Sequence, residues 1–305
     1  MKNLLMKTKA QLFALLLLTT NFSLFGQELK RLPVKKISIH EVSIQAGLFS
    51  EQNRNPKLSD FKSLAPKSLL LNSDLSNYYS SEYQLNSNPM ISLMIGMNVN
   101  RKQKITNRTN PLIKVGFCYF SGTILTSSLY KSEQKSYDTL TSLRTGQTVF
   151  VDSISSKSLI MNYSSNQIRL DGSLILRTNT KKRWSLFGGI GMTVGISIKA
   201  HTDIIATKSE RTETHFANGT NLYPSLNSRS NTFNKETFRN KNNFCASTYI
   251  PVGIDFRIGN KKTIWKKMHL FYELRPGLNI ISIPELRTIT NVNLQQGIGI
   301  KFSWD

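Results

Sequence analysis

The chain has 305 residues and carries 40 Lys and Arg against 18 Asp and Glu, which gives a formal net charge of +22. Hydrophobic residues make up 39%, and Ile, Leu, Val and Phe recur along the whole length, which excludes a disordered chain. The two cysteines, Cys118 and Cys245, exclude a disulfide scaffold and a multi-cysteine zinc module, and we expect both to be free thiols.

Residues 1–26 have the parts of a secretory signal peptide. A start with three lysines precedes an apolar run at 12–18, and Leu24-Phe25-Gly26 is a plausible cleavage boundary. The apolar run is too short for a stable membrane span, which disfavours the alternative of an N-terminal anchor helix. Residues 27–305 are therefore expected to form one exported domain.

Apolar and polar residues then alternate with a period of two, as they do in strands that have one apolar face. The eight expected strands span 37–49, 89–100, 113–126, 159–177, 184–199, 244–258, 267–281 and 290–304. Pro251 and Pro276 fall inside two of these strands. We expect β-bulges there, because proline cannot donate a hydrogen bond to a neighbouring strand.

The connections between these strands alternate in length. Residues 50–88, 127–158 and 200–243 make connections of 39, 32 and 44 residues, whereas 101–112, 178–183 and 259–266 make connections of 12, 6 and 8. An even-stranded membrane barrel predicts this alternation, because its loops are long at one rim and short at the other. The expected fold is all-β: an eight-stranded antiparallel transmembrane β-barrel with long extracellular loops and short periplasmic turns.

The alternation alone does not decide which face points outward, because a soluble lipocalin-like barrel produces the same pattern. The signal peptide, the long loops and the aromatic residues at strand ends favour an apolar exterior. Those aromatic residues are Phe49, Trp184, Phe244, Phe302 and Trp304. Glycines gather on the polar face, as expected inside a narrow lumen: Gly47, Gly96, Gly116, Gly189, Gly191, Gly195, Gly253, Gly277, Gly297 and Gly299.

The end of the chain resembles the C-terminal signal by which outer-membrane barrels are inserted, with Gly299, Phe302 and Trp304 in the matching positions. With its strand number, loop lengths and signal peptide, the chain is similar to small OmpA/OmpX-like barrels of the "porin family" type of the Bacteroidota. This resemblance implies a Gram-negative outer-membrane location, contacts with outer-membrane lipids, and recognition of the last strand by the barrel-assembly machinery. It implies no shared substrate, because such barrels include adhesion, assembly and lipid-modifying proteins.

Charges on the polar faces define the candidate site. An eight-stranded barrel is barely wide enough for its own side chains, and a buried charge without a partner is strongly destabilising. We therefore expect the inward charges to pair and to plug the lumen, so that no solute channel forms. The inward set is Glu41, Arg169, Asp171, Lys199, Asp255, Arg257, Glu273, Arg275 and Lys301.

The short turns are basic and contain no Asp or Glu; their cations include Arg101, Lys102, Lys104, Lys181, Lys182, Arg183, Lys261, Lys262 and Lys266. They indicate either a rim that contacts anionic lipid headgroups or an acidic periplasmic partner, or ordinary solubilising turns. Nucleic acid is not an expected partner of an exported barrel. Any recognition of an extracellular protein partner would belong to the long loops, which are rich in Ser, Asn, Thr and Tyr.

Signals for catalysis are few. The four histidines lack metal-ligand spacing, and we expect neither a metal nor another cofactor. Lipid A deacylases, which this barrel resembles, use a His/Ser pair and an acidic residue on the barrel exterior. His269 and Glu273 are expected in the lumen instead, with no serine close by. We expect a non-enzymatic protein with a structural, adhesion or envelope-assembly role; a small porin is the alternative, and a lipid A-modifying enzyme the third.

Overall fold

The computed structural model describes residues 37–52, 56–81, 85–99, 110–142, 144, 146–178, 182–216, 226–259 and 263–304. The expected signal peptide lies outside these residues. Among the described residues, no helix has the length and hydropathy needed to span a membrane.

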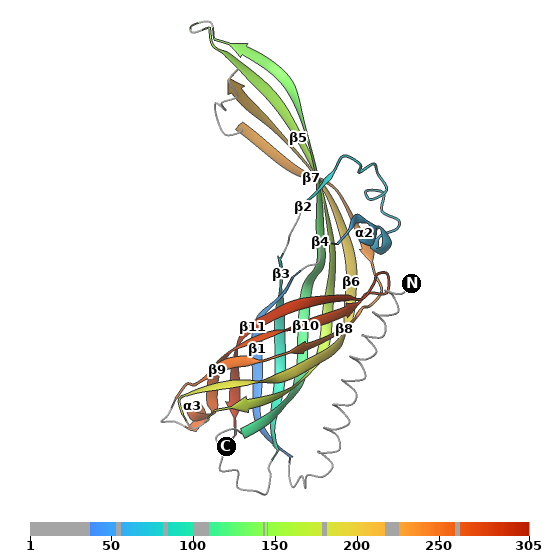
Figure 1. Ribbon diagram of the computed structural model, residues 1–305. Helices are drawn as coiled ribbons and strands as arrows, with labels where there is room; N and C mark the ends of the chain where they lie inside the picture. The colour runs from blue at the N-terminus through green and yellow to red at the C-terminus, as the bar shows by residue number, and fades with distance from the viewer. Residues whose placement is uncertain are drawn as a thin grey trace, which may run out of the picture.

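Antiparallel strands make up most of the described chain (Figure 1). They are β1 (Ile37–Gln52), β2 (Tyr79–Ser81), β3 (Leu85–Val99), β4 (Asn110–Thr141), β5 (Thr148–Arg177), β6 (Trp184–Phe216), β7 (Leu226–Arg239), β8 (Phe244–Tyr249), β9 (Val252–Arg257), β10 (Met268–Ser282) and β11 (Ile289–Ser303). Two short helices accompany them, α2 (Leu58–Leu64) and α3 (Thr263–Lys267).

The strands close into a ring of eight, counted over the described residues. Neighbours pair in the order β1-β3-β4-β5-β6, then β8 and β9 as one interrupted strand, then β10 and β11. β11 pairs back onto β1 from Glu41↔Ser303 to Glu51↔Asn293, which leaves the ring without an open edge. The expected eight-stranded antiparallel barrel is confirmed.

The outer surface of the ring is apolar on every one of these strands. Phe117, Leu170 and Ile298 are 60%, 52% and 54% exposed, while their chain neighbours point into the lumen. A soluble protein rarely exposes so continuous an apolar surface, whereas the lipid-facing band of a membrane barrel has this composition. The prediction of an apolar exterior is confirmed, and the fold is that of a transmembrane barrel.

Four of the five strand-end aromatic residues lie on this outer surface, as the sequence predicts: Trp184, Phe244, Phe302 and Trp304. The prediction for Phe49 is wrong. Phe49 is only 3% exposed and packs edge-to-face on Phe120 inside the barrel, with ring centroids 5.0 Å apart. The reason is that side chains alternate between the two faces of a strand, which we call its parity. Leu48 points outward and is 43% exposed, so Phe49 next to it must point inward.

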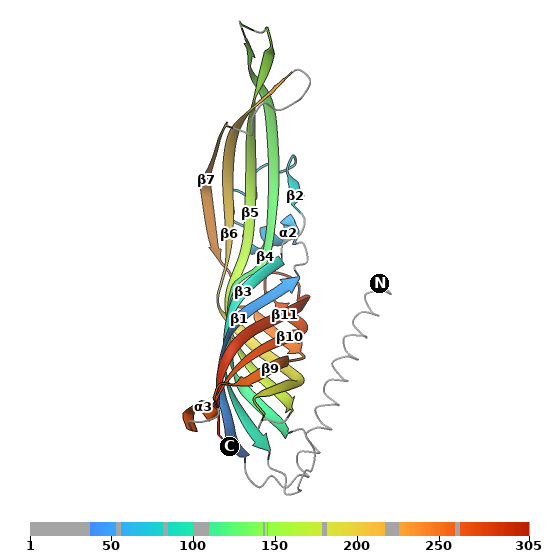
Figure 2. The same ribbon diagram turned by 90° about the vertical axis from the view of Figure 1, so that its left-hand side faces the viewer.

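Two of the three long connections are built mainly as strands. β4 and β5 remain paired as far as Thr141↔Thr148, and β6 continues to Phe216 with β7 beside it. Figure 2 shows these four strands rising out of the barrel as one sheet, which we call the extension. Residues 127–158 and much of 200–243 are therefore not irregular loops, because hairpin pairing satisfies their backbone groups.

The first long connection folds over the mouth of the lumen. Residues 56–81, which we call the cap, contain α2 and pack Phe61, Leu64 and Leu71 against an apolar cluster. That cluster takes residues from five barrel strands and includes Ile124, Met161, Ile204, Cys245 and Ile281. The cap therefore covers the end of the barrel from which the extension rises.

The two prolines inside strands do not cause the bulges that we expected. Leu274↔Val252 and Gly277↔Tyr249 keep one register across Pro251, and β10 pairs with β11 through Pro276 without a shift. Instead, the strand is interrupted at residues 250–251, between β8 and β9. Ile250 N donates to Pro276 O and Gly189 N donates to Pro251 O, both at 2.9 Å, so the neighbouring backbone groups stay satisfied.

Candidate functional site: the lumenal charge network

Seven of the predicted lumenal charges lie inside the barrel and are almost fully buried. Their exposed fractions are 2% or less: Glu41, Arg169, Asp171, Asp255, Glu273, Arg275 and Lys301. Arg257 lies at the rim that carries the short turns and is half-buried. Lys199 is the exception and is exposed outside the barrel. The pairing of β5 with β6 steps from Gln167↔Ser197 to Asn166↔Lys199, and this bulge leaves both Ile198 and Lys199 outside.

Glu41 is the centre of the layer of the network nearest the short turns. Its two carboxylate oxygens accept hydrogen bonds from Nη1 and Nη2 of Arg177, at 2.8 and 3.3 Å. Lys114 Nζ lies 3.2 Å from Oε1, and Lys301 Nζ lies 3.5 Å from Oε2. One buried carboxylate therefore balances three cations from three different strands.

Asp255 is the second acidic group of this layer. It contacts Lys301 Nζ through Oδ2, and its Oδ1 lies 2.8 Å from Nδ1 of His269. The other ring nitrogen of His269 lies 3.2 Å from Ser303 Oγ. The expectation that no serine lies near His269 is therefore wrong: antiparallel pairing places Ser303 of β11 next to the start of β10. The three groups make a chain of hydrogen bonds, all in the lumen.

Arg275 organises the middle layer. Its Nη1 donates to Asp171 Oδ2 at 2.8 Å, and its Nε donates to Glu273 Oε1 at 3.0 Å. Tyr249 donates its hydroxyl to Asp171 Oδ1, and Cys118 Sγ lies 3.2 Å from Asp171 Oδ2. These bonds connect four strands across the lumen and satisfy both carboxylates.

Gly191 supplies the space for this layer. A Cβ added at Gly191 would lie 2.3 Å from the ring of Tyr249, closer than any side chain can approach. This position explains one of the glycines that the sequence places on the polar face: the ring occupies the volume that a side chain would need.

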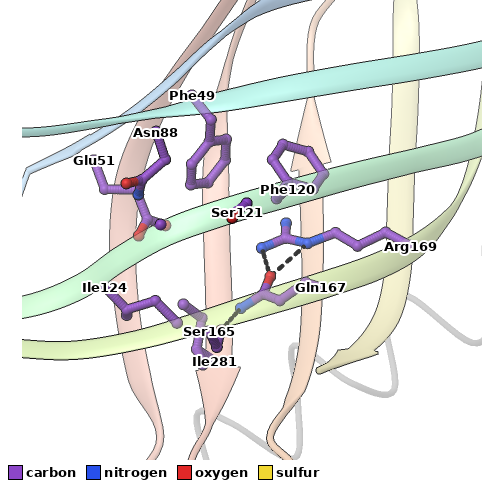
Figure 3. A pocket seen from close by; sticks show the side chains of 11 residues that line it. Phe49, Glu51, Asn88, Phe120, Ser121, Ile124, Ser165, Gln167, Arg169 and Ile281 are labelled. Atoms are coloured by element: carbon purple, nitrogen blue, oxygen red, sulfur yellow. Dashed lines mark hydrogen bonds between the residues drawn. The ribbon is translucent and has the colours of Figure 1, made fainter. Parts of the chain in front are cut away.

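Arg169 forms the upper layer, which Figure 3 shows from close by. Its guanidinium lies over the rings of Phe120 and Phe49, 4.5 and 5.3 Å from the centroids. Nη2 donates to Gln167 Oε1 at 2.6 Å, and Nη1 donates to Asn279 Oδ1 at 3.1 Å. Arg169, two aromatic rings and two amides therefore fill the cross-section of the lumen at this level. The cavity beside them has a volume of only about 10 Å³, which is about the room that one water molecule needs.

The cap closes the barrel above Arg169. Asn240 Nδ2 donates to Leu64 O at 2.8 Å, and Glu236 of β7 accepts hydrogen bonds from the Ser68 hydroxyl and Leu69 N of the cap. Burial at this end raises the pKa of Tyr163 to about 12, so its phenol stays protonated and accepts a hydrogen bond from Asn243 Nδ2. An apolar seal and three charged layers therefore follow one another along the axis.

Three charged residues of the network were not predicted. Lys114 and Arg177 are 4% and 5% exposed and face the lumen, and Glu51 is 2% exposed and accepts a hydrogen bond from Asn279 Nδ2. Alternation along the strands would have found the first two. Lys114 is next to the outward residue Val115, and Arg177 lies an even number of positions after Arg169 and Asp171, so it shares their inward face. Glu51 was missed because β1 continues beyond its expected end at residue 49.

The lumen also contains amides with no hydrogen-bond partner among the described residues. Both polar atoms of Asn293 and of Gln295 are in this state, at exposed fractions of 2% and 0%. Ordered water commonly satisfies such groups. A closed but hydrated lumen fits these side chains better than a dry one.

Part of the predicted basic rim can be described. Lys182 and Arg183 are exposed, and the guanidinium of Arg183 lies 4.8 Å from the ring centroid of Phe256. Lys266 is exposed on α3, next to Trp265, which is 46% exposed. The remaining predicted residues lie outside the described ranges: Arg101, Lys102, Lys104, Lys181, Lys261 and Lys262.

Within the described part of the chain, no three His, Cys, Asp or Glu side chains are grouped so that they could hold a metal ion. Both cysteines are free and buried, Cys118 in the charge network and Cys245 beneath the cap.

Comparisons with known proteins give distant likenesses. No protein-family model and no curated protein matches the sequence. Among solved structures, Neisserial surface protein A is similar over 88% of this chain and 100% of its own, with 8% identity and a TM-score of 0.34. Ail, the attachment invasion locus protein of Yersinia pestis, matches 87% of this chain and 100% of its own at 11% identity and a TM-score of 0.24. The translocator domain of the autotransporter NalP from Neisseria meningitidis matches 94% and 96%, at 10% identity and a TM-score of 0.20. The fold assignment therefore rests on the strand pairing of this chain itself.

Proposed function

We propose that this protein is an OmpA/OmpX-like outer-membrane barrel with a plugged lumen, whose role is adhesion, structure or envelope assembly rather than transport or catalysis. The observation that carries the proposal is the closure of the lumen. Five buried carboxylates and five buried cations pack inside it: Glu41, Glu51, Asp171, Asp255 and Glu273 with Lys114, Arg169, Arg177, Arg275 and Lys301. Equal numbers of both signs favour pairing over an ion pathway.

The apolar outer belt supports a location in the outer membrane, after cleavage of the signal peptide. Phe302 and Trp304 point outward at the end of β11, where they are available to the barrel-assembly machinery. Membership of the "porin family" type found in the Bacteroidota remains part of the proposal. The extension, which projects beyond the barrel, is the surface on which we place binding of a protein partner.

Planar-bilayer recording tests the plugged lumen. The purified mature chain is expected to give no stable conductance, because its cross-section is filled by paired side chains. Arg275→Ala and Asp255→Ala should each produce openings, since each leaves partners uncompensated and removes volume. Glu133→Ala is the matched control, because Glu133 lies on the extension and is 48% exposed. A steady ohmic conductance of the wild-type chain would contradict the proposal and favour the porin.

Cysteine labelling tests location and orientation together. Cys118 and Cys245 are 1% and 0% exposed, so a thiol reagent should leave the wild-type chain unlabelled. An impermeant maleimide added to intact cells should label Tyr137→Cys, which lies on the extension at 76% exposure. It should reach Ile264→Cys on α3 only after the outer membrane is opened. The reverse pattern would overturn the orientation, and labelling of both sites in intact cells would overturn the membrane location.

A further inference from the structure

A groove on the outer surface lies where the extension leaves the barrel. It has a volume of about 610 Å³ and is lined by side chains of β6 and β7, among them Lys199, His201, Asp203, Lys235 and Arg239. The register places His201 opposite Arg239 and Asp203 opposite Thr237, so these side chains share one face of the sheet. The groove is open to solvent along one side rather than enclosed.

The groove is positively charged. Lys199, Lys235 and Arg239 are exposed cations, and Asp203 is the one carboxylate among the lining residues. That carboxylate is already engaged, because Lys235 Nζ lies 3.4 Å from its Oδ2 and Thr237 Oγ1 donates to its Oδ1 at 2.6 Å. Within the described residues, no carboxylate forms an ion pair with Lys199 or Arg239. Two cations therefore remain for a ligand.

The same groove borders the apolar belt. Ile198 lines its lower end and is 51% exposed; Ile196 and Phe244, paired neighbours below it, are 54% and 49% exposed. On β5, which pairs with β6, the outward residues beside the groove are polar: Asn166 lies opposite Lys199, and Ser164 lies opposite His201. The groove is therefore at the boundary between lipid-facing and water-facing surface, on the extension side of the barrel.

We propose that this groove binds the phosphorylated headgroup of an outer-leaflet glycolipid of the lipid A kind. Lys199 and Arg239 bind the phosphate, and the acyl chains lie along Ile196, Ile198 and Phe244. A soluble phosphate would use the cations but would gain nothing from the adjoining apolar strip. An anionic lipid uses both, and charged contacts of this kind strengthen association with a negatively charged membrane surface. The inference rests on the proposed membrane location.

The test compares two triple variants of the full mature chain in detergent micelles. Lys199→Gln/Lys235→Gln/Arg239→Gln removes the cations of the groove. Lys62→Gln/Lys67→Gln/Lys157→Gln removes the same number of exposed cations, two from the cap and one from β5. Binding of bis-phosphorylated lipid A, its dephosphorylated form and inorganic phosphate is then measured by native mass spectrometry and by titration.

The wild-type chain and the control should bind bis-phosphorylated lipid A, and the groove variant should bind it on the order of tenfold or more weakly, because phosphate recognition depends on paired cations. The dephosphorylated lipid should bind all three chains equally weakly. Equal affinity of the groove variant and the wild-type chain would overturn the inference. Inorganic phosphate that competes at the same concentration as lipid A would show a site for soluble phosphate, which also overturns it.

Gel mobility separates this inference from the proposed function. A folded barrel migrates faster before boiling than after it, and both triple variants should keep this difference, since their substitutions lie outside the lumen. A chain that folds and inserts but does not bind lipid A would refute the groove site alone. A chain that does not insert into membranes at all would refute the location on which the site depends.

Discussion

The barrel and the extension share β4, β5 and β6, whereas β7 belongs to the extension alone. Along the shared strands the polarity is inverted. In the barrel part of β5, Arg169 and Asp171 face inward and Leu170 faces outward. Farther along the same strand, Leu159 and Met161 face inward, while Asn162 faces outward. Both parts have the same period of two, so the strand geometry is unchanged. What differs is the surroundings: lipid outside the barrel, and water outside the extension.

This inversion shows how one strand can serve two environments. Where the outer face meets lipid, charges can only be placed inside, and they must be paired there. Where the outer face meets water, the apolar side chains move inside and need another element to cover them. The cap supplies that cover, since Phe61, Leu64 and Leu71 pack on the inner face of the extension and on the barrel mouth.

The largest effect should come from removing the carboxylate at the centre of the lumenal network. Glu41→Ala leaves Lys114, Arg177 and Lys301 close together without their shared partner. We expect it to lower the free energy of unfolding by about 3–5 kcal/mol, the usual consequence of removing one member of a buried ion pair. Urea titration of the barrel in lipid vesicles measures the change.

The matched control for that variant is Glu133→Ala on the extension, whose ion pair with Lys131 is at the surface. Surface pairs contribute about 0–1 kcal/mol, so this change should be near the limit of measurement. A loss of similar size in both variants would mean that the lumen is as hydrated as the extension, and the contrast between the two regions would fail.

A second test concerns the apolar inner face. Phe61 is fully buried in the cap, and Phe61→Ala should weaken docking of the cap by ~3 kcal/mol, a typical value for removing a buried aromatic ring. Limited proteolysis of the reconstituted protein should then cut within residues 56–81 much faster. Leu69→Ala is the control, because Leu69 is 80% exposed in the same segment. Equal cleavage of the two variants would show that the cap is not held by its apolar face.

Alternation in the sequence predicts the barrel well, because the membrane imposes one rule on every strand. Strand number, apolar exterior and seven of the inward charges follow from parity alone. Lys199 does not, since a single extra residue at a bulge reverses the faces beyond it, and nothing in the local sequence marks that position. Phe49 shows the opposite error. Alternation along β1 indicated that it points inward, but its aromatic ring at the end of a strand was taken to indicate an outward position.

The extension is harder to predict, because the far end of β4 is exposed to water on both faces. From Lys131 to Thr141 hydrophobic alternation is lost, and the pairing depends on polar cross-strand contacts such as Tyr130 with Ser156. In β6 a weak signal was present, since Ala200, Ile204 and Ala206 share the reversed parity while Ile205 between them is also apolar. The cap also had a signal, because Leu58, Phe61 and Leu64 have helical spacing.

A third test places the same charge on the outer face of one strand in both regions. Leu170→Arg puts a guanidinium into the apolar belt, which should lower the free energy of unfolding in lipid by about 2–4 kcal/mol. Asn162→Arg, on the same face of β5 but in the extension, should change it by less than ~0.5 kcal/mol. Unfolding titrations in vesicles of one lipid give both values. An equal cost at the two positions would contradict the assignment of lipid and water to the two regions.

The smallest effect is expected at the hydrogen-bond chain of Asp255, His269 and Ser303. The order of these groups resembles a catalytic triad, but Ser303 is only 8% exposed, and Asp255 is shared with Lys301. We interpret the chain as part of the structural network. Ser303→Ala should then lower the free energy of unfolding by about 1 kcal/mol, the value of one hydrogen bond, and a fluorophosphonate probe should not label the wild-type chain. Labelling of the wild-type chain that disappears in both Ser303→Ala and His269→Ala would instead assign a reactive serine to the lumen, which would contradict the proposed non-enzymatic role.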